Sequence, residues 1–360
     1  MTTPADTQPF ALDRFVGWRE SATSGEAIAA ALAAARTALP AARDLLAGAE
    51  RVVVTGAGSS YYLAQTVAAA ARDASRRSFA AAPLSELILR PDGVLDAGPV
   101  GRRPIIVISR SGSTSEALAV VEQMRALGHP TIAVTCRPES PLAALADVTL
   151  VSPAGDEEAI VMTRSFASML ALLLRLIADV AGADALARGL DELPDRWTEA
   201  ADAAETGRRL GATDWSRVVI LGGGPSAGIA AEWGLKLTET SQVPTLAFEP
   251  LEFRHGPISV CEPGVLVVGL IAGAGAADEV RVIEEAGRLG ASTWVVARDR
   301  AEAGSAGGDV SLIGGGLDAA ARLPLLLHPA HALAFRLAVT RGCDPDRPRH
   351  LGQVVIIDAP

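Results

Sequence analysis

Two stretches of this chain, 166 residues apart, carry the same order of structural signals. Residues 51–70 read RVVVTGAGSSYYLAQTVAAA, and residues 217–236 read RVVILGGGPSAGIAAEWGLK. Each has a short β-branched run, a Gly-rich turn, a serine and an apolar segment of helical composition. A strand that leads through a tight turn into a helix is the unit of parallel α/β sheets. Its recurrence predicts an α/β fold with two doubly wound, flavodoxin-like parallel-sheet lobes related by an internal repeat.

The remaining signals divide the chain into five parts. We expect an N-terminal helical segment (1–48), a first lobe (49–185), a connecting helix (186–212), a second lobe (213–343) and a C-terminal tail (344–360). A length of 360 residues is large for a single core, which agrees with two lobes. The expected strands are Arg51–Thr55, Ser78–Ala82, Pro104–Ser109, Thr131–Thr135 and Val148–Val151, then Arg217–Leu221, Thr245–Phe248, Val265–Ile271, Ser292–Ala297 and Val310–Ile313.

The composition argues against several classes of protein. A net charge of −10 disfavours general binding to nucleic acid or to a membrane surface. The segment Met1–Arg14 is polar, unlike a signal peptide, and no run of about 18 apolar residues occurs, so we expect a cytoplasmic chain without a membrane span. The scattered Cys136, Cys261 and Cys343 fit small buried thiols in a reducing compartment.

The sequence does not favour a cofactor or a metal. The turn Gly56–Ser60 has Tyr61 where a dinucleotide-binding turn has its third glycine, and Ser78–Ala82 ends without an acidic residue. No histidine or cysteine pair has the spacing of a zinc site. We therefore expect neither a nicotinamide cofactor nor a metal ion.

A hydroxyl-rich loop, Ser109–Thr114 (SRSGST), follows a buried strand and precedes a helix. Backbone N–H groups at a helix start attract anions, and Gly112 allows a close approach. An ordinary N-cap is the alternative, because serine and threonine commonly precede helices. Four hydroxyls within six residues exceed what capping requires. The loop therefore predicts a phosphate site.

Glu239 and His255 are the candidate acid/base groups. Glu239 lies near the end of an expected helix, and His255 lies in a turn bounded by Gly256-Pro257. Glu239 could instead be a surface carboxylate paired with Lys236 three residues earlier, and His255 an ordinary turn histidine. Packing or capping is the simpler interpretation of the other histidines, although His350 in the tail stays a weak candidate. The candidate pair gains weight from occurring together, downstream of an anion-binding loop.

These motifs, in this order, resemble the sugar isomerase (SIS) domain proteins. The arrangement is similar to the tandem isomerase half of glucosamine-6-phosphate synthase and to the stand-alone AgaS-like amino-sugar-phosphate deaminase/isomerases. The resemblance covers about residues 45–357. The matching motifs are Gly58-Ser59-Ser60-Tyr61, Ser109–Thr114, Glu157 with Thr163-Arg164-Ser165-Phe166, Leu235–Glu239, Glu252–Pro257 and Asp346–Leu351.

The resemblance implies roles for particular residues. Glu239 would shuttle a proton between C1 and C2, and His255 would assist ring opening from a second subunit, so a homodimer with shared active sites is implied. The residues implied to contact the substrate or its phosphate are Ser59, Ser60, Ser109, Arg110 (through its main chain), Ser111, Thr114, Thr163 and Gln353.

Two departures from the synthase pattern guide the expected function. Residue 2 is Thr and no cysteine nucleophile of a glutaminase is present, so we expect no ammonia from glutamine. Gln353 stands where the synthases carry a tail lysine that forms an imine with the ketose, and glutamine cannot form that imine. Both departures favour the deaminase branch, whose substrate already carries an amine at C2.

The leading hypothesis is therefore a phosphosugar isomerase/deaminase that releases ammonia from an amino-sugar 6-phosphate. One alternative is a fructosamine-6-phosphate deglycase, which would use the same proton shuttle with a bulkier amine. The alternative of another class is a non-catalytic sugar-phosphate-binding regulator. Such a regulator has no need of Glu239 or His255, and residues 1–50 contain no basic helix-turn-helix pattern.

Overall fold

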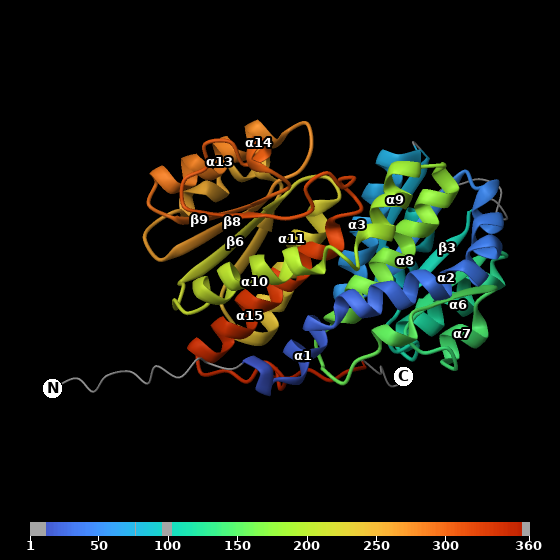
Figure 1. Ribbon diagram of the computed structural model, residues 1–360. Helices are drawn as coiled ribbons and strands as arrows, with labels where there is room; N and C mark the ends of the chain where they lie inside the picture. Colours follow the sequence, from blue (N-terminus) through green and yellow to red (C-terminus); the bar gives the residue numbers. More distant parts are fainter. Residues whose placement is uncertain (1–11, 76, 96–102, 355–360) are drawn as a thin grey trace.

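Two α/β lobes, each built on one parallel sheet, lie side by side in the computed structural model (Figure 1), which describes residues 12–75, 77–95 and 103–354. The first sheet has the strand order β2-β1-β3-β4-β5. Its strands are β1 (Arg51–Gly56), β2 (Ser78–Pro83), β3 (Ile105–Ile108), β4 (Thr131–Thr135) and β5 (Val148–Val151). These strands are almost continuous apolar runs because helices cover both faces of a parallel sheet.

The second sheet repeats this topology. Read from β7, its order is β7-β6-β8-β9-β10, and all of its pairings are parallel. Its strands are β6 (Arg217–Gly222), β7 (Thr245–Phe248), β8 (Val265–Leu270), β9 (Ser292–Ala297) and β10 (Asp309–Leu312). In both sheets the second strand in sequence lies outside the first, and the third lies on its other side. The predicted two-lobe repeat is thereby confirmed.

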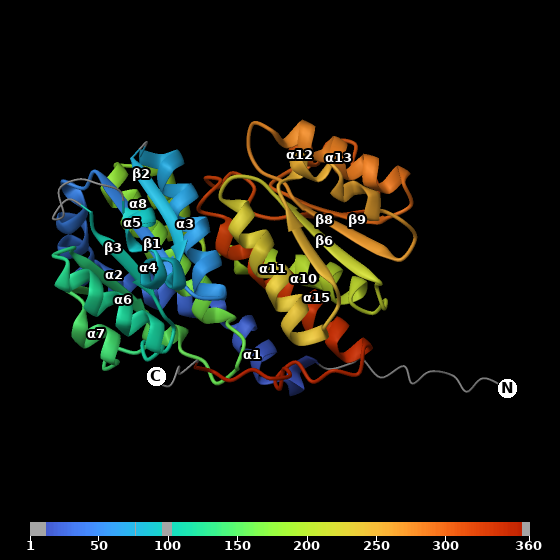
Figure 2. The same cartoon turned by 180° about the vertical axis from the view of Figure 1, so that it is seen from behind.

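Helices α3 (Ser59–Ser75) and α11 (Ser226–Ser241) follow the two Gly-rich turns and pack against each other between the lobes (Figures 1 and 2). They approach closely at Gly228, where an added Cβ would lie 2.3 Å from the Thr66 Oγ1 and 2.5 Å from the Tyr62 carbonyl oxygen. The pairing is antiparallel, since the start of α3 also meets Glu232, further along α11. This helix pair joins the carboxyl ends of both sheets.

The other helices complete the layers of each lobe. In the first lobe α8 is buried along nearly its whole length, and α2 packs beside it. In the second lobe α15 is the central helix, and α10 and α11 pack on it. The longer helices besides α3 and α11 are α1 (Val16–Ala22), α2 (Ser24–Ala47), α6 (Ser115–Ala126), α8 (Arg164–Ala181), α9 (Asp184–Glu192), α10 (Trp197–Leu210), α13 (Ala276–Arg288) and α15 (Leu327–Thr340). The short ones are α4 (Leu84–Leu89), α5 (Pro91–Leu95), α7 (Pro141–Leu145), α12 (Pro250–Phe253) and α14 (Arg300–Ala303), with 3₁₀ turns at Leu12–Arg14, Pro153–Gly155, Pro257–Val260 and Leu323–Leu326.

The N-terminal segment and the tail cross between the lobes. Helix α2 packs on α8 of the first lobe, whereas α1 packs on α15 of the second. The tail returns beneath α1 towards the first lobe (Figure 2). The carboxylate of Asp346 accepts hydrogen bonds from the N–H groups of Val16 (2.7 Å) and Gly17 (3.0 Å), so the tail caps the start of α1.

Several strand ends, such as those of β3 and β10, differ from the expected ranges by one residue, and two helical segments differ more. The expected single helix over residues 15–48 is divided at Thr23 into α1 and α2. The apolar pattern of the sequence predicts a helix over His331–Thr340, but α15 begins earlier, at Leu327. Pro329 is tolerated in its first turn because the N–H that proline lacks would have no intrahelical partner there. The proposed domain boundaries stay predictions.

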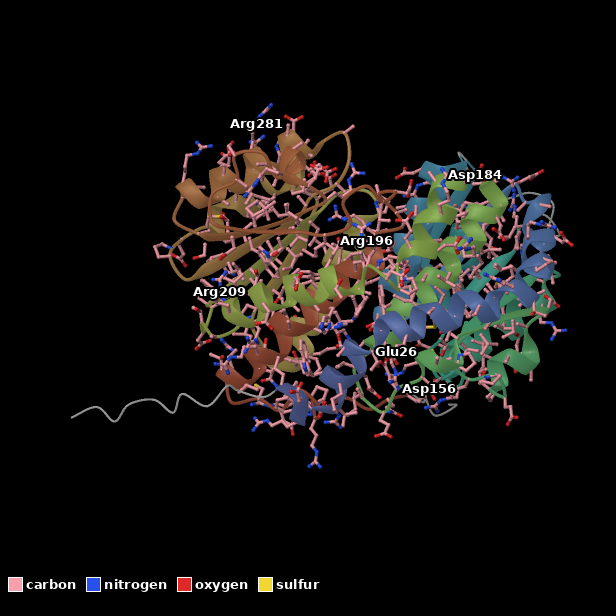
Figure 3. All side chains as sticks on the ribbon, in the orientation of Figure 1. Glu26, Asp156, Asp184, Arg196, Arg209 and Arg281 are labelled. Carbon is pink, nitrogen blue, oxygen red and sulfur yellow. The ribbon has the colours of Figure 1, made fainter. Side chains whose placement is uncertain are left out.

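Charged side chains lie mainly at the surface, and Arg209 and Arg281 project from the second lobe in Figure 3. One described helical stretch, Leu323–Thr340, has the length and hydropathy of a membrane span. It is 83% buried inside the protein, as expected for the core helix of a globular lobe. The three cysteines carry free thiols, and burial raises the pKa of the Cys136 thiol.

Candidate active site

A cavity of about 210 Å³ lies at the carboxyl ends of β1 and β3, where the strand order of the first sheet reverses. Doubly wound sheets bind ligands in the crevice at this switch point. The turn after β1, the loop after β3, helix α11 and the tail all contribute to its wall. Its polar lining consists of Ser59, Ser60, Ser109, Arg110, Ser111, Thr114, Glu116, Lys236, Glu239 and Gln353.

The loop Ser109–Thr114 folds so that its hydroxyls share one small volume. The Ser109 Oγ lies 3.1 Å from the Thr114 Oγ1, and the Ser113 hydroxyl donates to the Ser111 Oγ at 3.1 Å. Gly112 has a φ of 60°, and a Cβ at this position would lie 2.2 Å from the Ser140 Oγ. This backbone shape therefore requires glycine.

The capping alternative for this loop does not account for its hydroxyls. Thr114 is the N-cap residue of α6, yet its side chain makes no capping hydrogen bond. Among the described residues the backbone N–H groups of Ser111 and Thr114 have no hydrogen-bond partner. Unpaired backbone donors at a helix start, beside hydroxyls that pair only within the loop, suit an anion.

Two serines begin α3 on the opposite side of the cavity. The Ser60 hydroxyl contacts the sulfur of Met162 at 3.8 Å. The Ser59 hydroxyl donates to the Glu232 Oε1 at 3.0 Å, so it links the first Gly-rich turn to α11. Both predicted serines thus line the cavity, and Ser59 already has a protein partner.

Helix α11 brings two carboxylates and one ammonium together at the cavity. The Lys236 Nζ lies 2.5 Å from the Glu239 Oε2 and 3.5 Å from the Glu232 Oε1. The Lys236 side chain is 1% exposed and that of Glu239 is 19% exposed, so this is not the solvated surface pair that the sequence left open. Glu239 is therefore the most exposed of the three side chains, and it lines the cavity.

Burial and mutual attraction set the charges of this cluster. Burial disfavours the charged form of Lys236, but the carboxylates of Glu232 and Glu239 outweigh that effect and raise its pKa. Burial raises the pKa of Glu232 to about 8, against the opposing attraction of Lys236. One Glu232 oxygen, Oε2, is buried without a partner among the described groups. At neutral pH the cluster thus holds an ammonium beside the more exposed carboxylate.

The sequence reasoning did not include Glu232 or Lys236 among the site residues. The available signal was their spacing: positions 232, 236 and 239 follow the i, i+4, i+7 pattern of one helix face. Glu232 and Ser59, which form a hydrogen bond, are 173 residues apart in the sequence, so no local pattern indicates their contact.

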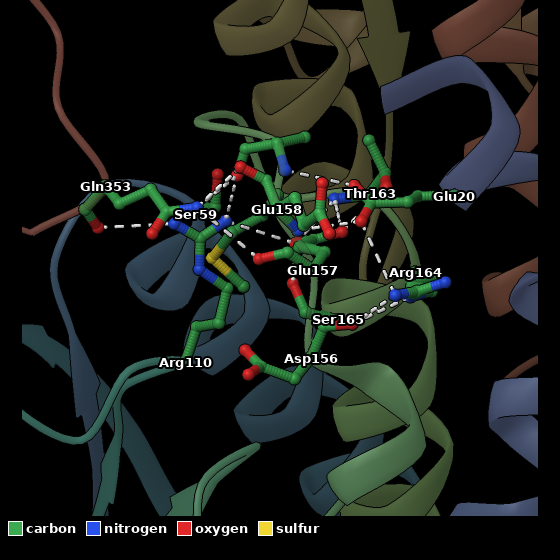
Figure 4. Close-up of polar contacts among 12 residues, drawn as sticks. Glu20, Ser59, Arg110, Asp156, Glu157, Glu158, Thr163, Arg164, Ser165 and Gln353 are labelled. Atoms are coloured by element: carbon green, nitrogen blue, oxygen red, sulfur yellow. Dashed lines mark hydrogen bonds and ion pairs between the residues drawn. The ribbon is translucent and has the colours of Figure 1, made fainter. Parts of the chain in front are cut away.

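Behind the loop, Arg110 and Glu157 form a buried ion pair at 3.2 Å (Figure 4). Glu157 also accepts hydrogen bonds from the Thr163 N–H (3.0 Å) and hydroxyl (2.7 Å), and from the Ser165 hydroxyl. Thr163 is fully buried and does not line the cavity, so the structure does not bring it to the predicted substrate position. Its hydroxyl instead orients the carboxylate that holds Arg110.

Gln353 lines the cavity and fastens the tail to this network (Figure 4). Its side-chain amide donates to the main-chain carbonyl of Glu158 at 2.5 Å, and the main-chain carbonyl of Gln353 accepts from the Arg110 guanidinium at 3.2 Å. Arg110 was expected to act through its main chain, but its side chain holds Glu157 and the tail. The tail therefore forms one wall of the site.

The histidines occupy two different environments. His255 follows α12, is exposed and does not line the cavity within this chain; His350 in the tail is also exposed. His328 and His331 are buried, and each places its Nδ1 2.7 Å from the Ser21 hydroxyl. Burial lowers the pKa of both rings. The packing role expected for His328 and His331 agrees with these contacts.

Comparison with known proteins places the chain in a family. The SIS domain model matches residues 45–178 and 213–302. A candidate D-galactosamine-6-phosphate deaminase, AgaS, of Streptomyces coelicolor is 31% identical over 343 residues, which cover 89% of this chain and 87% of that protein. A glucosamine-6-phosphate deaminase structure from Thermotoga maritima is 28% identical with a TM-score of 0.76 and covers 95% of this chain and 100% of that one.

A longer relative shows the same similarity over part of its length. The isomerizing glutamine–fructose-6-phosphate aminotransferase of Aeropyrum pernix is 31% identical over 347 residues. This match covers 89% of the present chain but 53% of the aminotransferase, so the chain spans about half the length of such relatives. The predicted resemblance to the synthase isomerase half and to AgaS-like proteins is confirmed, and the chain belongs to the SIS domain family.

Proposed function

We propose that this chain is a phosphosugar isomerase/deaminase that converts an amino-sugar 6-phosphate to a ketose phosphate and ammonia. One observation carries the proposal: the Lys236–Glu239 pair faces the hydroxyl-rich loop Ser109–Thr114 across a single cavity. A phosphate grip on one wall and a carboxylate base on the other are what proton transfer on a sugar phosphate needs.

In the proposed reaction the phosphate binds Ser109, Ser111 and Thr114 at the start of α6. The open-chain substrate then presents C1 and C2 to Glu239. The Glu239 carboxylate removes the C2 proton and returns it to C1, while O1 gains the proton that the amine gives up. Water adds to the resulting C2 imine, and ammonia leaves as the C2 ketone forms.

Lys236 has two roles in this scheme. Its ammonium, held by Glu232, fixes the Glu239 carboxylate in position at 2.5 Å. It also places a positive charge beside the cavity, where the reaction develops negative charge on the substrate. Ser59 supports the arrangement indirectly through its hydrogen bond to Glu232.

Gln353 supports deamination over synthesis of the amino sugar. Its amide is engaged with the Glu158 carbonyl, and it offers no amine that could form an imine with a ketose. The cluster of Glu232, Lys236 and Glu239 also disfavours the non-catalytic regulator, because sugar-phosphate binding alone does not require a buried ion cluster.

A homodimer with shared active sites and a cytoplasmic location are part of the proposal. The exposed position of His255 is compatible with delivery to a neighbouring subunit. The free cysteines suit a reducing compartment, where sugar phosphates are used.

The decisive experiment measures ammonia release from glucosamine, galactosamine and mannosamine 6-phosphates and from a fructosamine 6-phosphate, with Glu239→Gln as the matched control. Release from one of the first three, lost in the control, is the expected result. Free amine released only from the fructosamine would assign the deglycase alternative. Sugar-phosphate binding without turnover of any of these substrates would assign the regulator.

A further inference from the structure

A second cavity, of about 430 Å³, occupies the equivalent crevice of the second lobe. It lies at the carboxyl ends of β6 and β8, the switch point of the second sheet. The turn Gly223–Ser226 and the loop after β8 form one side. The carboxyl-terminal part of α3 and the start of α9 form the other.

The internal repeat relates the two cavities residue by residue. With the offset of 166 residues, Ser226 corresponds to Ser60 and Asp73 corresponds to Glu239. Ser60 and Glu239 line the first cavity, and Ser226 and Asp73 line the second. The second cavity therefore keeps a hydroxyl at the turn and a carboxylate on the facing helix.

The two cavities differ in charge. The first contains Arg110, Lys236 and the hydroxyl loop. The lining of the second contains four carboxylates and no lysine, arginine or histidine among the described residues. The acidic residues are Asp73, Glu249, Glu279 and Asp318. A phosphate is disfavoured in such surroundings by like-charge repulsion.

Two of these carboxylates converge on Gly223. A Cβ built there would lie 2.8 Å from the Glu279 Oε1 and 3.3 Å from the Glu249 Oε1. Neither carboxylate forms an ion pair among the described residues, and the Ala272 N–H is the one hydrogen-bond donor to Glu279, at 3.4 Å. Burial, with a contribution from Glu249, raises the pKa of Glu279 to about 7. Glu249 and Glu279 thus lie at the cavity without a cationic partner within ion-pair distance among the described residues.

Ser226 provides an independent sign of a ligand. Its side chain is 2% exposed and lines the cavity, yet its hydroxyl has no hydrogen-bond partner in the described part of the chain. A hydroxyl that is open to the cavity and pairs with no described protein group can form a hydrogen bond with a molecule bound there.

We propose that the second-lobe cavity binds a small organic cation that carries hydroxyl groups, of the class of an unphosphorylated amino sugar. The ammonium would pair with Glu249 and Glu279, and a hydroxyl would pair with Ser226. The volume lies within the range of small-molecule sites. A metal ion is the poorer occupant, because the described residues contain no group of three or more His, Cys, Asp or Glu arranged to hold one.

The test uses calorimetric titration of the full chain with glucosamine, and with glucose as the uncharged probe of the same shape. Saturable binding of glucosamine is expected, with glucose binding at least about tenfold more weakly, since glucose lacks the ammonium that would pair with the carboxylates. The double variant Glu249→Gln/Glu279→Gln should lose glucosamine binding by a similar factor. Ser226→Ala, a smaller change, provides a second readout should the double variant fail to fold.

The control is Ser111→Ala/Thr114→Ala, which alters only the first cavity and should leave glucosamine affinity unchanged. Several outcomes would overturn the proposal: no glucosamine binding, equal binding of glucose, loss of binding in the control variant alone, or tight binding of Mg²⁺ at the second cavity. None of these measurements depends on catalytic activity, so their outcome tests the second cavity independently of the proposed function.

Discussion

The ammonium nitrogen of Lys236 lies 2.5 Å from the Glu239 carboxylate and is itself almost completely buried. Burial disfavours its charged form, but Glu232 and Glu239 together outweigh that effect and raise its pKa above the ordinary value. The pair therefore combines a base that contacts the cavity with a cation that orients it. This relationship generates the first two predictions.

Replacing Glu239 by Gln keeps the shape of the site and removes the base. We expect kcat to fall by about 10² or more, while sugar-phosphate binding persists. Washout of deuterium from substrate C2 into solvent, followed by NMR, checks the assignment. Washout at the wild-type rate in Glu239→Gln would mean that another residue is the base, and His350 or Glu252 would be tested next.

Replacing Lys236 by Met leaves Glu232 and Glu239 without their shared cation. Removing one partner of a buried ion pair costs about 3–5 kcal/mol, so urea denaturation should show a large loss of stability. The double variant Lys236→Met/Glu239→Gln removes both partners of the 2.5 Å ion pair and should recover part of the loss. No recovery would show that the ion pair is not what stabilises this part of α11.

The phosphate loop is tested by the double variant Ser111→Ala/Thr114→Ala. Hydrogen bonds to a charged group are worth about 1.5–3 kcal/mol each, so KM for the sugar phosphate should rise at least about tenfold. Ser115→Ala, on the first residue of α6, serves as the nearby control. An unchanged affinity for inorganic phosphate and for sugar phosphate in the double variant would contradict this assignment.

Stability should fall as the pH drops below about 6.5, because His328 and His331 are buried in their neutral form. Burial lowers the pKa of His328 to about 4, whereas in the unfolded chain the ring takes up a proton near the ordinary histidine pKa of 6.5. Between these values the unfolded state binds more protons, so each ring costs about 1.4 kcal/mol per pH unit. Urea unfolding at pH 7 and pH 5.5 measures this slope. His331→Leu should make it shallower, and an identical slope would refute the explanation.

A composite active site predicts complementation between inactive chains. Mixed dimers of Glu239→Gln and His255→Ala contain one site with both wild-type residues if His255 crosses to the neighbouring subunit. Activity should then return in part when the two variants are refolded together. Dead heterodimers, with each parent shown to be folded by circular dichroism, would rule out delivery of His255 to the neighbouring subunit.

The strands were predictable because their signals are local. The β-branched runs that begin at Arg51 and Arg217 form β1 and β6, and a Gly-rich turn follows each strand. The recurrence of this pattern predicts the second lobe. Gly112 and its hydroxyl neighbours likewise form a local pattern, and the structure brings them to the cavity.

Partners distant in sequence were not predictable in the same way. Nothing near Thr163 indicates that its hydroxyl turns to Glu157 and away from the cavity. The contact of Ser59 with Glu232 depends on how the two lobes pack, a property that periodicity within one helix does not contain. The trans delivery of His255 involves a second chain and stays a prediction.

The antiparallel contact of α3 and α11 at Gly228 has a thermodynamic consequence. Helix α3 starts at the first cavity with Ser59 and reaches the second with Asp73, while α11 starts at the second with Ser226 and reaches the first with Glu239. Any occupant that shifts this helix pair at one end must change the free energy of binding at the other. By thermodynamic linkage the effect is reciprocal. A ligand in either cavity would therefore change the affinity of the other cavity by the same factor.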